Sequence, residues 1–236
     1  MSQSAAEVAY SAVDVVGAWD ETPQLRAVRL DLGALGALHR APGQALKIRS
    51  GDGESFFALA TRPGEAHGEI LIKRGPPLAD SLVAEAQPGA QLQISAPAGR
   101  GFPVEEVRGR DVLLFAAGSG ISPIRAVVRH ILHVRREVGR VVLFYGQRHP
   151  GDFAYRDERP TWEGAGIETV LCCTQPDHGW AGGHGHVQDV ARETSFAGVA
   201  PEGAVAFLCG MRAMVHAVRD ALGKAGMPAE RSHLNY

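Results

Sequence analysis

The chain has 236 residues, with 24 Lys and Arg against 26 Asp and Glu, so its charge is nearly balanced. This balance argues against a nucleic-acid-binding protein, and no apolar run approaches the ~18 residues that a membrane span needs. The first basic residue is Arg26, so the start lacks the charged region of a signal peptide, and we expect a soluble, cytoplasmic protein. The three cysteines have neither metal-ligand nor iron–sulfur spacing.

The first half of the chain reads as short strands divided by turns such as APGQ, SGDGE and QPGA. Six segments carry this strand pattern: residues 9–19, 24–32, 45–50, 55–62, 69–75 and 90–97. One helical stretch, residues 77–86, precedes the last of them. Short strands at near-regular spacing predict a small closed barrel, here a six-stranded antiparallel β-barrel domain over residues 1–107.

After this half the rhythm changes to strands that alternate with helices. The expected strands, apolar apart from the last, are residues 111–116, 141–146, 168–173, 204–210 and 232–236. The expected helices are residues 122–139, 186–193 and 211–226, with a shorter helical stretch after the second strand. Continuous apolar strands between helices predict a five-stranded parallel sheet covered on both sides, an α/β domain over residues 108–236.

The stretch AAGSGISPIRA joins the first of these strands to its helix. Gly118 and Gly120 stand where the strand ends, and Pro123 suits the first helical turn, whose N–H groups have no partner inside the helix. In an open parallel sheet, ligands bind at this carboxyl edge. The turn is therefore a candidate anion cradle, with a purely architectural tight turn as the alternative.

Two other chemistries are disfavoured. Ser119 lies between glycines, but Ala117 and Ile121 occupy the positions where a hydrolase nucleophile elbow carries its outer glycines. The histidines of DHGWAGGHGHV have no carboxylate or cysteine at ligand spacing, so we expect no metal site.

The predicted barrel followed by AAGSGISPIRA, FYGQR, CGM and a terminal aromatic residue resembles the ferredoxin–NADP reductase-like flavoproteins, in particular stand-alone members without an iron–sulfur domain. The resemblance covers nearly the whole chain, and the second half carries its specific motifs. It implies an FAD-binding barrel followed by a domain that binds NADH or NADPH.

Carried over by position, the resemblance assigns two groups of residues to the nicotinamide dinucleotide. The nicotinamide and pyrophosphate would lie beside the turns after the first and fourth strands of the sheet, at Gly118, Ser119, Gly120, Pro123, Cys209, Gly210 and Met211. Arg148, after the second strand, would hold the adenosine end. Cys209 would shape hydride transfer as a catalytic residue that is not a nucleophile, the alternative being a small core residue.

On the flavin side, the family's R-x-Y-S/T motif corresponds to Ser55, Phe56, Phe57 and Ala58, so the arginine and the hydroxyl are missing while Phe57 keeps an aromatic face. This departure predicts weaker flavin retention than in relatives. The remaining cofactor-binding candidates are two glycine-containing elements: Lys73, Gly75 and Ser81 near a helix start, and Gly99, Gly101 and Phe102 in GRGF.

Tyr236 is the last residue printed, and the resemblance implies that it stacks over the flavin as a second catalytic residue, a frayed sheet edge being the alternative. NADH is favoured over NADPH because the stretch after the third strand, CCTQPDHGW, has no basic residue for a ribose phosphate.

The resulting hypothesis is an FAD-dependent NAD(P)H oxidoreductase that passes hydride from the nicotinamide to flavin N5 and on to an acceptor that the sequence does not identify, such as a protein. Two alternatives stay open. One is an electron-transfer subunit of a larger redox complex, and the other is a nucleotide-binding module without flavin, suggested by the altered Ser55 motif.

Overall fold

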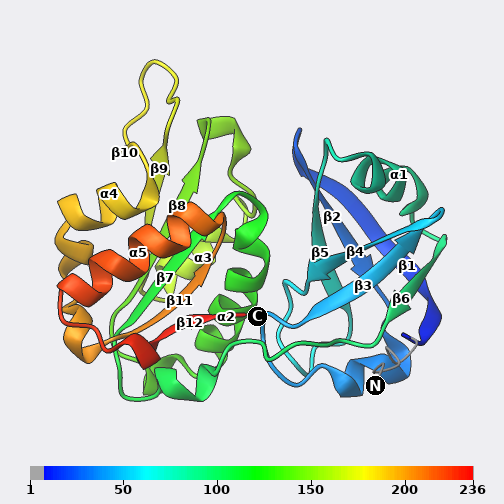
Figure 1. The fold of residues 1–236 in the computed structure, drawn as a ribbon, viewed down its shortest axis with the longest axis horizontal. Helices are drawn as coiled ribbons and strands as arrows, with labels where there is room; N and C mark the ends of the chain where they lie inside the picture. The colour runs from blue at the N-terminus through cyan, green and yellow to red at the C-terminus, as the bar shows by residue number, and fades with distance from the viewer. Residues whose placement is uncertain (1–7, 236) are drawn as a thin grey trace, which may run out of the picture.

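The computed structural model describes residues 8–235 and places two halves side by side, an all-β half and an α/β half (Figure 1). Both halves follow the predicted fold class. The proposed division between residues 107 and 108 falls between a short 3₁₀ helix, Val104–Val107, and the first strand of the second half. Tyr236 lies outside the described residues.

The first half is one antiparallel sheet with the strand order β4-β3-β6-β1-β2-β5. Its strands are β1 (Tyr10–Thr22), β2 (Leu25–Leu30), β3 (Ala45–Ser50), β4 (Gly53–Ala58), β5 (Gly68–Lys73) and β6 (Gln91–Ser95). An isolated bridge between Leu59 and Ile70 joins the two edges, so the sheet closes as a barrel. The helix α1 (Pro77–Glu85) packs at one end, as predicted, and a 3₁₀ helix at Gly33–Leu38 was not expected.

The second half is a parallel sheet with the order β10-β9-β8-β7-β11-β12. Its strands are β7 (Val112–Ala117), β8 (Val141–Gln147), β9 (Ile167–Cys173), β10 (Gly183–His184), β11 (Val205–Cys209) and β12 (Ser232–Leu234). The sheet has six strands where five were expected, because the two-residue β10 pairs with the end of β9. A strand this short, in a glycine-rich segment, has no apolar periodicity to predict it.

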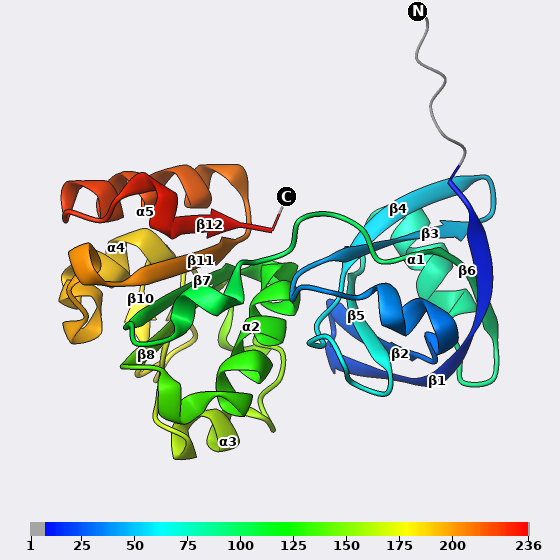
Figure 2. The same ribbon diagram turned by 90° about the horizontal axis from the view of Figure 1, so that it is seen from below.

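Helices cover both faces of this sheet (Figure 2). They are α2 (Ile121–His133), α3 (Arg159–Gly164), α4 (Val187–Glu193) and α5 (Arg212–Lys224). Successive residues of β7 point to opposite faces, so Leu114 packs with α2 and α3 while Leu113 and Phe115 pack with α4 and α5. This two-sided burial explains why the strands are apolar throughout.

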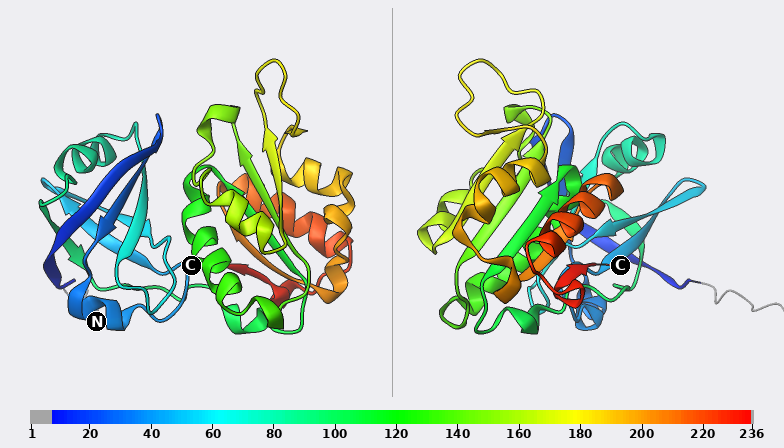
Figure 3. Two further views of the ribbon diagram at one scale, coloured as in Figure 1. Left: turned by 180° about the vertical axis from the view of Figure 1, so that it is seen from behind. Right: turned by 60° about the vertical axis from the view of Figure 1, so that its left-hand side comes forward.

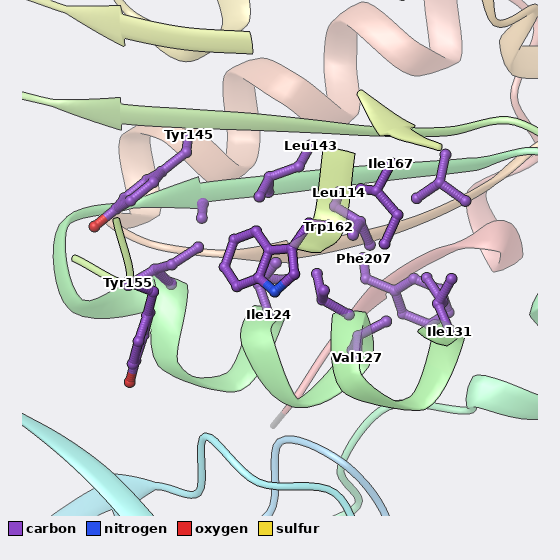
Figure 4. Close-up of a cluster of buried hydrophobic side chains, with 14 of the residues drawn as sticks. Leu114, Ile124, Val127, Ile131, Leu143, Tyr145, Tyr155, Trp162, Ile167 and Phe207 are labelled. Carbon is purple, nitrogen blue, oxygen red and sulfur yellow. The ribbon is translucent and has the colours of Figure 1, made fainter. Parts of the chain in front are cut away.

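The helix α2 faces the barrel as well as the sheet (Figure 3, left). The apolar cluster between α2 and the sheet, shown in Figure 4, continues into the barrel through Leu25, Ala27, Leu71 and Phe102. The two halves therefore share one buried core, which fixes the glycine turn at the start of α2 against the barrel. Among residues 8–235, no helix has the length and apolar character required to cross a membrane.

Candidate functional site

The turn after β7 is held against the turn after β11 by direct backbone contact. Gly118 has φ +60°, and Gly120 lies so close to the other turn that a Cβ on it would be 2.3 Å from the Cys209 carbonyl oxygen. Because β7 and β11 are neighbours and run parallel, both turns lie at the carboxyl edge of the sheet. Only glycine satisfies the close approach at position 120, whereas a Cβ on Gly118 would enter open space.

Both turns present the start of a helix to this edge. The first turns of α2 and α5 contain no acidic residue, and neither helix has a side chain capping its N-terminus. The N–H groups of a first turn lack partners within the helix and carry partial positive charge, to which Arg212 adds a full charge at the start of α5. Two adjacent helix starts of this kind suit a pyrophosphate.

A tyrosine that the sequence analysis missed supports the glycine turn. The buried hydroxyl of Tyr145 in β8 lies 3.4 Å from the Gly118 carbonyl oxygen, to which it can donate, and accepts hydrogen bonds from Gln147 Nε2 at 2.6 Å and from the Ala154 N–H at 3.4 Å. Burial raises the pKa of Tyr145, so the hydroxyl keeps its proton. Its position in an apolar strand gave no sign of this role, since a strand-borne tyrosine is usually a core residue.

Cys209 ends β11, with its side chain partly exposed, and is a free thiol. Burial raises the pKa of its thiol to about 12, so the sulfur carries no negative charge near neutral pH and is a poor nucleophile. This agrees with a shape-defining role at the turn. Met211, two residues later, is 67% exposed and stands free at the start of α5.

The predicted adenosine end lies one strand further along the same edge. Arg148 is exposed immediately after β8, and its carbonyl accepts a hydrogen bond of 2.8 Å from the Gln175 N–H after β9. The exposed residues that follow β9, Thr174 to His178, include Asp177 and no lysine or arginine. Arg148 is thus the one lysine or arginine among the residues directly after these two strands, 148–149 and 174–178.

The end of β4 reaches the same place from the barrel. The hydroxyl of Ser122, in the first turn of α2, donates a 2.8 Å hydrogen bond to the Ala58 carbonyl. This contact brings Ala58 beside the glycine turn, and its predicted contact with the flavin stays a prediction. Phe57 is opposite the fully buried Leu46 in the sheet and packs partly against the barrel core, whereas Phe56 points outward and is 64% exposed.

The second barrel element, with Lys73, Gly75 and Ser81, is close to α1, and Gly75 and Ser81 already make hydrogen bonds within the chain. Asp80 accepts a 2.9 Å hydrogen bond from the Gly75 N–H, and the Ser81 hydroxyl donates a 2.9 Å bond to Glu85. Lys73 is exposed at the end of β5. Lys73 is therefore the candidate of this element that keeps its polar group without an ion pair among residues 8–235.

The GRGF segment packs as a connector. A Cβ on Gly101 would lie 2.6 Å from the Cβ of Ala41, and Phe102 is buried with its ring centroid 5.4 Å from that of Phe207. Gly99 accepts a 2.9 Å hydrogen bond from Gln44 Nε2 through its carbonyl. These contacts give Phe102 a packing role between the halves and Gly101 a packing role within the first half, and cofactor contact stays a prediction.

The last described residue, Asn235, donates a 3.0 Å hydrogen bond from Nδ2 to the Gly43 carbonyl of the barrel. The strand β12 therefore ends at the junction of the two halves (Figure 1). The catalytic role predicted for Tyr236 falls on the next residue, outside the described part of the chain.

A buried ion cluster at the domain junction was also missed. Arg125, 3% exposed on α2, donates a 3.0 Å hydrogen bond to the Ala60 carbonyl and pairs with Glu69 at 3.2 Å and with Glu158. Its guanidinium carbon lies 4.5 Å from the ring centroid of Tyr155. Burial raises the pKa of the 1%-exposed Glu69, and Arg125 opposes that shift. An isolated arginine in a helix pattern does not reveal a partner 56 residues away.

Residues 8–235 contain no group of three or more His, Cys, Asp and Glu side chains arranged to hold a metal ion. Of the histidines in this segment, His184 belongs to β10 and His186 is the N-cap residue of α4.

Residues 114–220 match the family described as oxidoreductase NAD-binding domain. Sulfhydrogenase 1 subunit gamma of Pyrococcus furiosus is 27% identical over 80% of this chain, and the chain spans 65% of that relative's length. Ferredoxin–NADP reductase B of Sorangium cellulosum is 28% identical over 80% of each chain. Among solved structures, a ferredoxin–NADP⁺ reductase from Neisseria gonorrhoeae with bound FAD and NADP has TM-score 0.78 at 18% identity and covers 93% of each chain. The matched fold confirms the predicted fold class, and the sequence matches agree with the resemblance.

Proposed function

We propose that this chain, a ferredoxin–NADP reductase-like protein by its two-domain fold and by the oxidoreductase NAD-binding domain at residues 114–220, is a flavin-dependent NAD(P)H oxidoreductase. In this proposal FAD is the flavin, hydride passes from the nicotinamide to flavin N5, and electrons leave to an acceptor still to be identified. One observation carries the proposal: the glycine turn before α2 contacts the β11–α5 turn, and Ser122, two residues beyond Gly120, donates a hydrogen bond to the end of β4.

The dinucleotide is assigned to the sheet edge. The first-turn N–H groups of α2 and α5 bind the pyrophosphate, and Arg212 adds positive charge beside them. The Tyr145 hydroxyl supports Gly118 through its carbonyl oxygen, so the turn keeps its shape when ligand binds. Cys209 and Gly210 give the nicotinamide a close, uncharged backbone surface, since the thiol stays protonated.

The flavin ring is assigned to the junction beside Ala58, between β4 and the glycine turn. When bound, flavin supplies a ring that accepts a hydride. The residues around it act by placement: Ser122 ties β4 to α2, and Arg125 holds the following residues of the barrel through the Ala60 carbonyl. Small displacements of reacting groups slow a reaction strongly, so a rigid junction serves hydride transfer.

NADH is the preferred dinucleotide in this proposal. Arg148 is the one lysine or arginine among the residues directly after β8 and β9, 148–149 and 174–178, and the exposed Asp177 would repel a ribose phosphate. A protein acceptor is a second element of the proposal, supported by the likeness to a hydrogenase subunit.

The test is the visible absorption of the purified chain mixed with FAD, recorded anaerobically before and after NADH or NADPH is added. We expect the oxidised flavin band to bleach faster with NADH. A chain that changes neither the flavin spectrum nor its reduction rate with either dinucleotide would refute the function. Faster bleaching with NADPH would refute only the preference.

A further inference from the structure

We propose that the barrel recognises flavin by its ring and not by its phosphates, so that riboflavin, FMN and FAD bind with similar affinity and flavin is an exchangeable substrate of the enzyme. This inference rests on the proposed function and specifies the substrate class of its flavin site. It follows from the side chains that stand where β4 meets α1, the region to which the resemblance assigns the flavin phosphates.

Position 55 offers no charge to this region. Ser55 pairs with Ile48 in the sheet and shares its face with Gly53, two residues earlier. A Cβ on Gly53 would lie 2.8 Å from Leu78 Cδ1, so the start of α1 packs directly on the start of β4. The side-chain face of Ser55 is therefore directed to the α1 start, where a small hydroxyl and a leucine stand instead of a guanidinium.

The start of α1 is a poor anion site. Pro76 is its N-cap residue and Pro77 its first residue, and neither has an N–H to donate. The N–H of Gly75, just before these prolines, donates a 2.9 Å hydrogen bond to the carboxylate of Asp80 in the first turn of the helix. This carboxylate neutralises the positive end of the helix dipole that a phosphate would otherwise use.

A second carboxylate, that of Glu85, accepts hydrogen bonds from the hydroxyl groups of this region. Glu85 Oε1 accepts hydrogen bonds from Ser81 Oγ at 2.9 Å and from the buried Ser50 Oγ at 2.6 Å. A hydroxyl that donates to a carboxylate has no second proton for a phosphate oxygen. Ser81 is thus satisfied by the chain itself.

The nearby cations are largely committed. Arg74 pairs with Asp20 at 2.7 Å, and Lys47 pairs with Glu54 on the outer face of the β3–β4 hairpin. Lys73 is exposed at the end of β5 and has no ion pair among residues 8–235. One solvated lysine opposite two carboxylates gives little net attraction for a pyrophosphate, because exposed charge pairs contribute weakly.

The reaction balances with flavin as substrate. The C4 hydride of NAD(P)H passes to N5 of the oxidised flavin, and solvent supplies the proton that N1 takes up. The products are NAD(P)⁺ and reduced flavin, which dissociates and carries two electrons to an acceptor outside this chain. No further reductant is required, because the NAD(P)H bound at the proposed nicotinamide site supplies the hydride.

The experiment is a fluorescence titration of the full chain with riboflavin, FMN and FAD in separate samples at one ionic strength. We expect the three dissociation constants to agree within about fivefold, as expected if phosphate contacts contribute about 1 kcal/mol or less. FAD binding more than a hundredfold tighter than riboflavin would overturn this inference while leaving the oxidoreductase function in place. Failure of all three flavins to bind would overturn both.

A charge variant tests the carboxylates directly. Asp80→Asn with Glu85→Gln keeps the side-chain shapes and removes two negative charges; we expect FAD to bind at least fivefold tighter and riboflavin to be unchanged. Glu193→Gln, exposed at the end of α4 in the other half, is the matched control and should alter neither affinity. Equal changes for FAD and riboflavin in the double variant would contradict phosphate repulsion.

Discussion

Replacing Gly120 by alanine should break the contact between the two turns that form the dinucleotide edge. A Cβ there would lie 2.3 Å from the Cys209 carbonyl oxygen, 2.6 Å from its carbon and 2.9 Å from the Gly210 nitrogen. All three are backbone atoms, so no side-chain rotation can relieve the overlap. Overpacking a filled site costs about 1–3 kcal/mol, and fixed neighbours place this variant at the upper end, about 3 kcal/mol.

The assay is urea unfolding together with thermal unfolding. For a chain of this size, about 3 kcal/mol corresponds to a loss of roughly 6–12 °C in Tm. Gly118→Ala is the first control: its Cβ meets nothing within 4 Å, so only the φ of +60° costs stability, about 1–2 kcal/mol. Gly203→Ala is the second, with open space and no positive φ, and should change stability by less than about 0.5 kcal/mol. If Gly120→Ala were no more destabilising than Gly203→Ala, the close-approach argument would be wrong.

Three further outcomes are expected. Arg125→Met should destabilise the chain by about 3 kcal/mol in urea unfolding, because the buried Glu69 carboxylate then keeps only the half-exposed Arg29, at 3.2 Å, as an ion-pair partner among the described residues. Adding Glu69→Gln should recover part of the loss; a double variant as unstable as the single would contradict this. Cys209→Ser should slow anaerobic flavin reduction about tenfold, because it shifts the backbone surface proposed to position the nicotinamide. A thiol reagent at pH 8 should leave the Cys209 thiol of the folded chain unmodified, because its pKa is about 12. Rapid labelling of Cys209 in the folded chain would disprove this protection. Burial lowers the pKa of His39 and of His130, so the unfolded state binds more protons than the folded state. The free energy of unfolding should therefore be highest above the unfolded pKa of about 6.5 and fall as the pH drops through the lower folded pKa values. His39→Asn should make the free energy of unfolding depend less steeply on pH in that range.

The fold was accessible from sequence, and a dinucleotide site at the sheet edge could be predicted, because the signals of both are local. Strand and helix periods differ, and the glycine turn lies between an apolar strand and a proline-started helix. The strand β10 was not predicted, because two residues beside glycines are too few to show a strand period. The register of β4 was also invisible, although it decides that Phe57 packs toward the core while Phe56 faces solvent.

The sequence by itself determined the two-domain architecture; it also predicts a site at the carboxyl edge of the sheet and, through the resemblance, the loss of a flavin-phosphate arginine at Ser55. Only the tertiary structure decided which polar groups remain available there. Tyr145 supports Gly118, Arg125 meets Glu69, and Glu85 occupies Ser81, through contacts between residues from 4 to 56 positions apart. A hydroxyl or a guanidinium has the same letter whether it is free or engaged; its partner, and therefore its capacity to bind a ligand, exists only once the chain has folded.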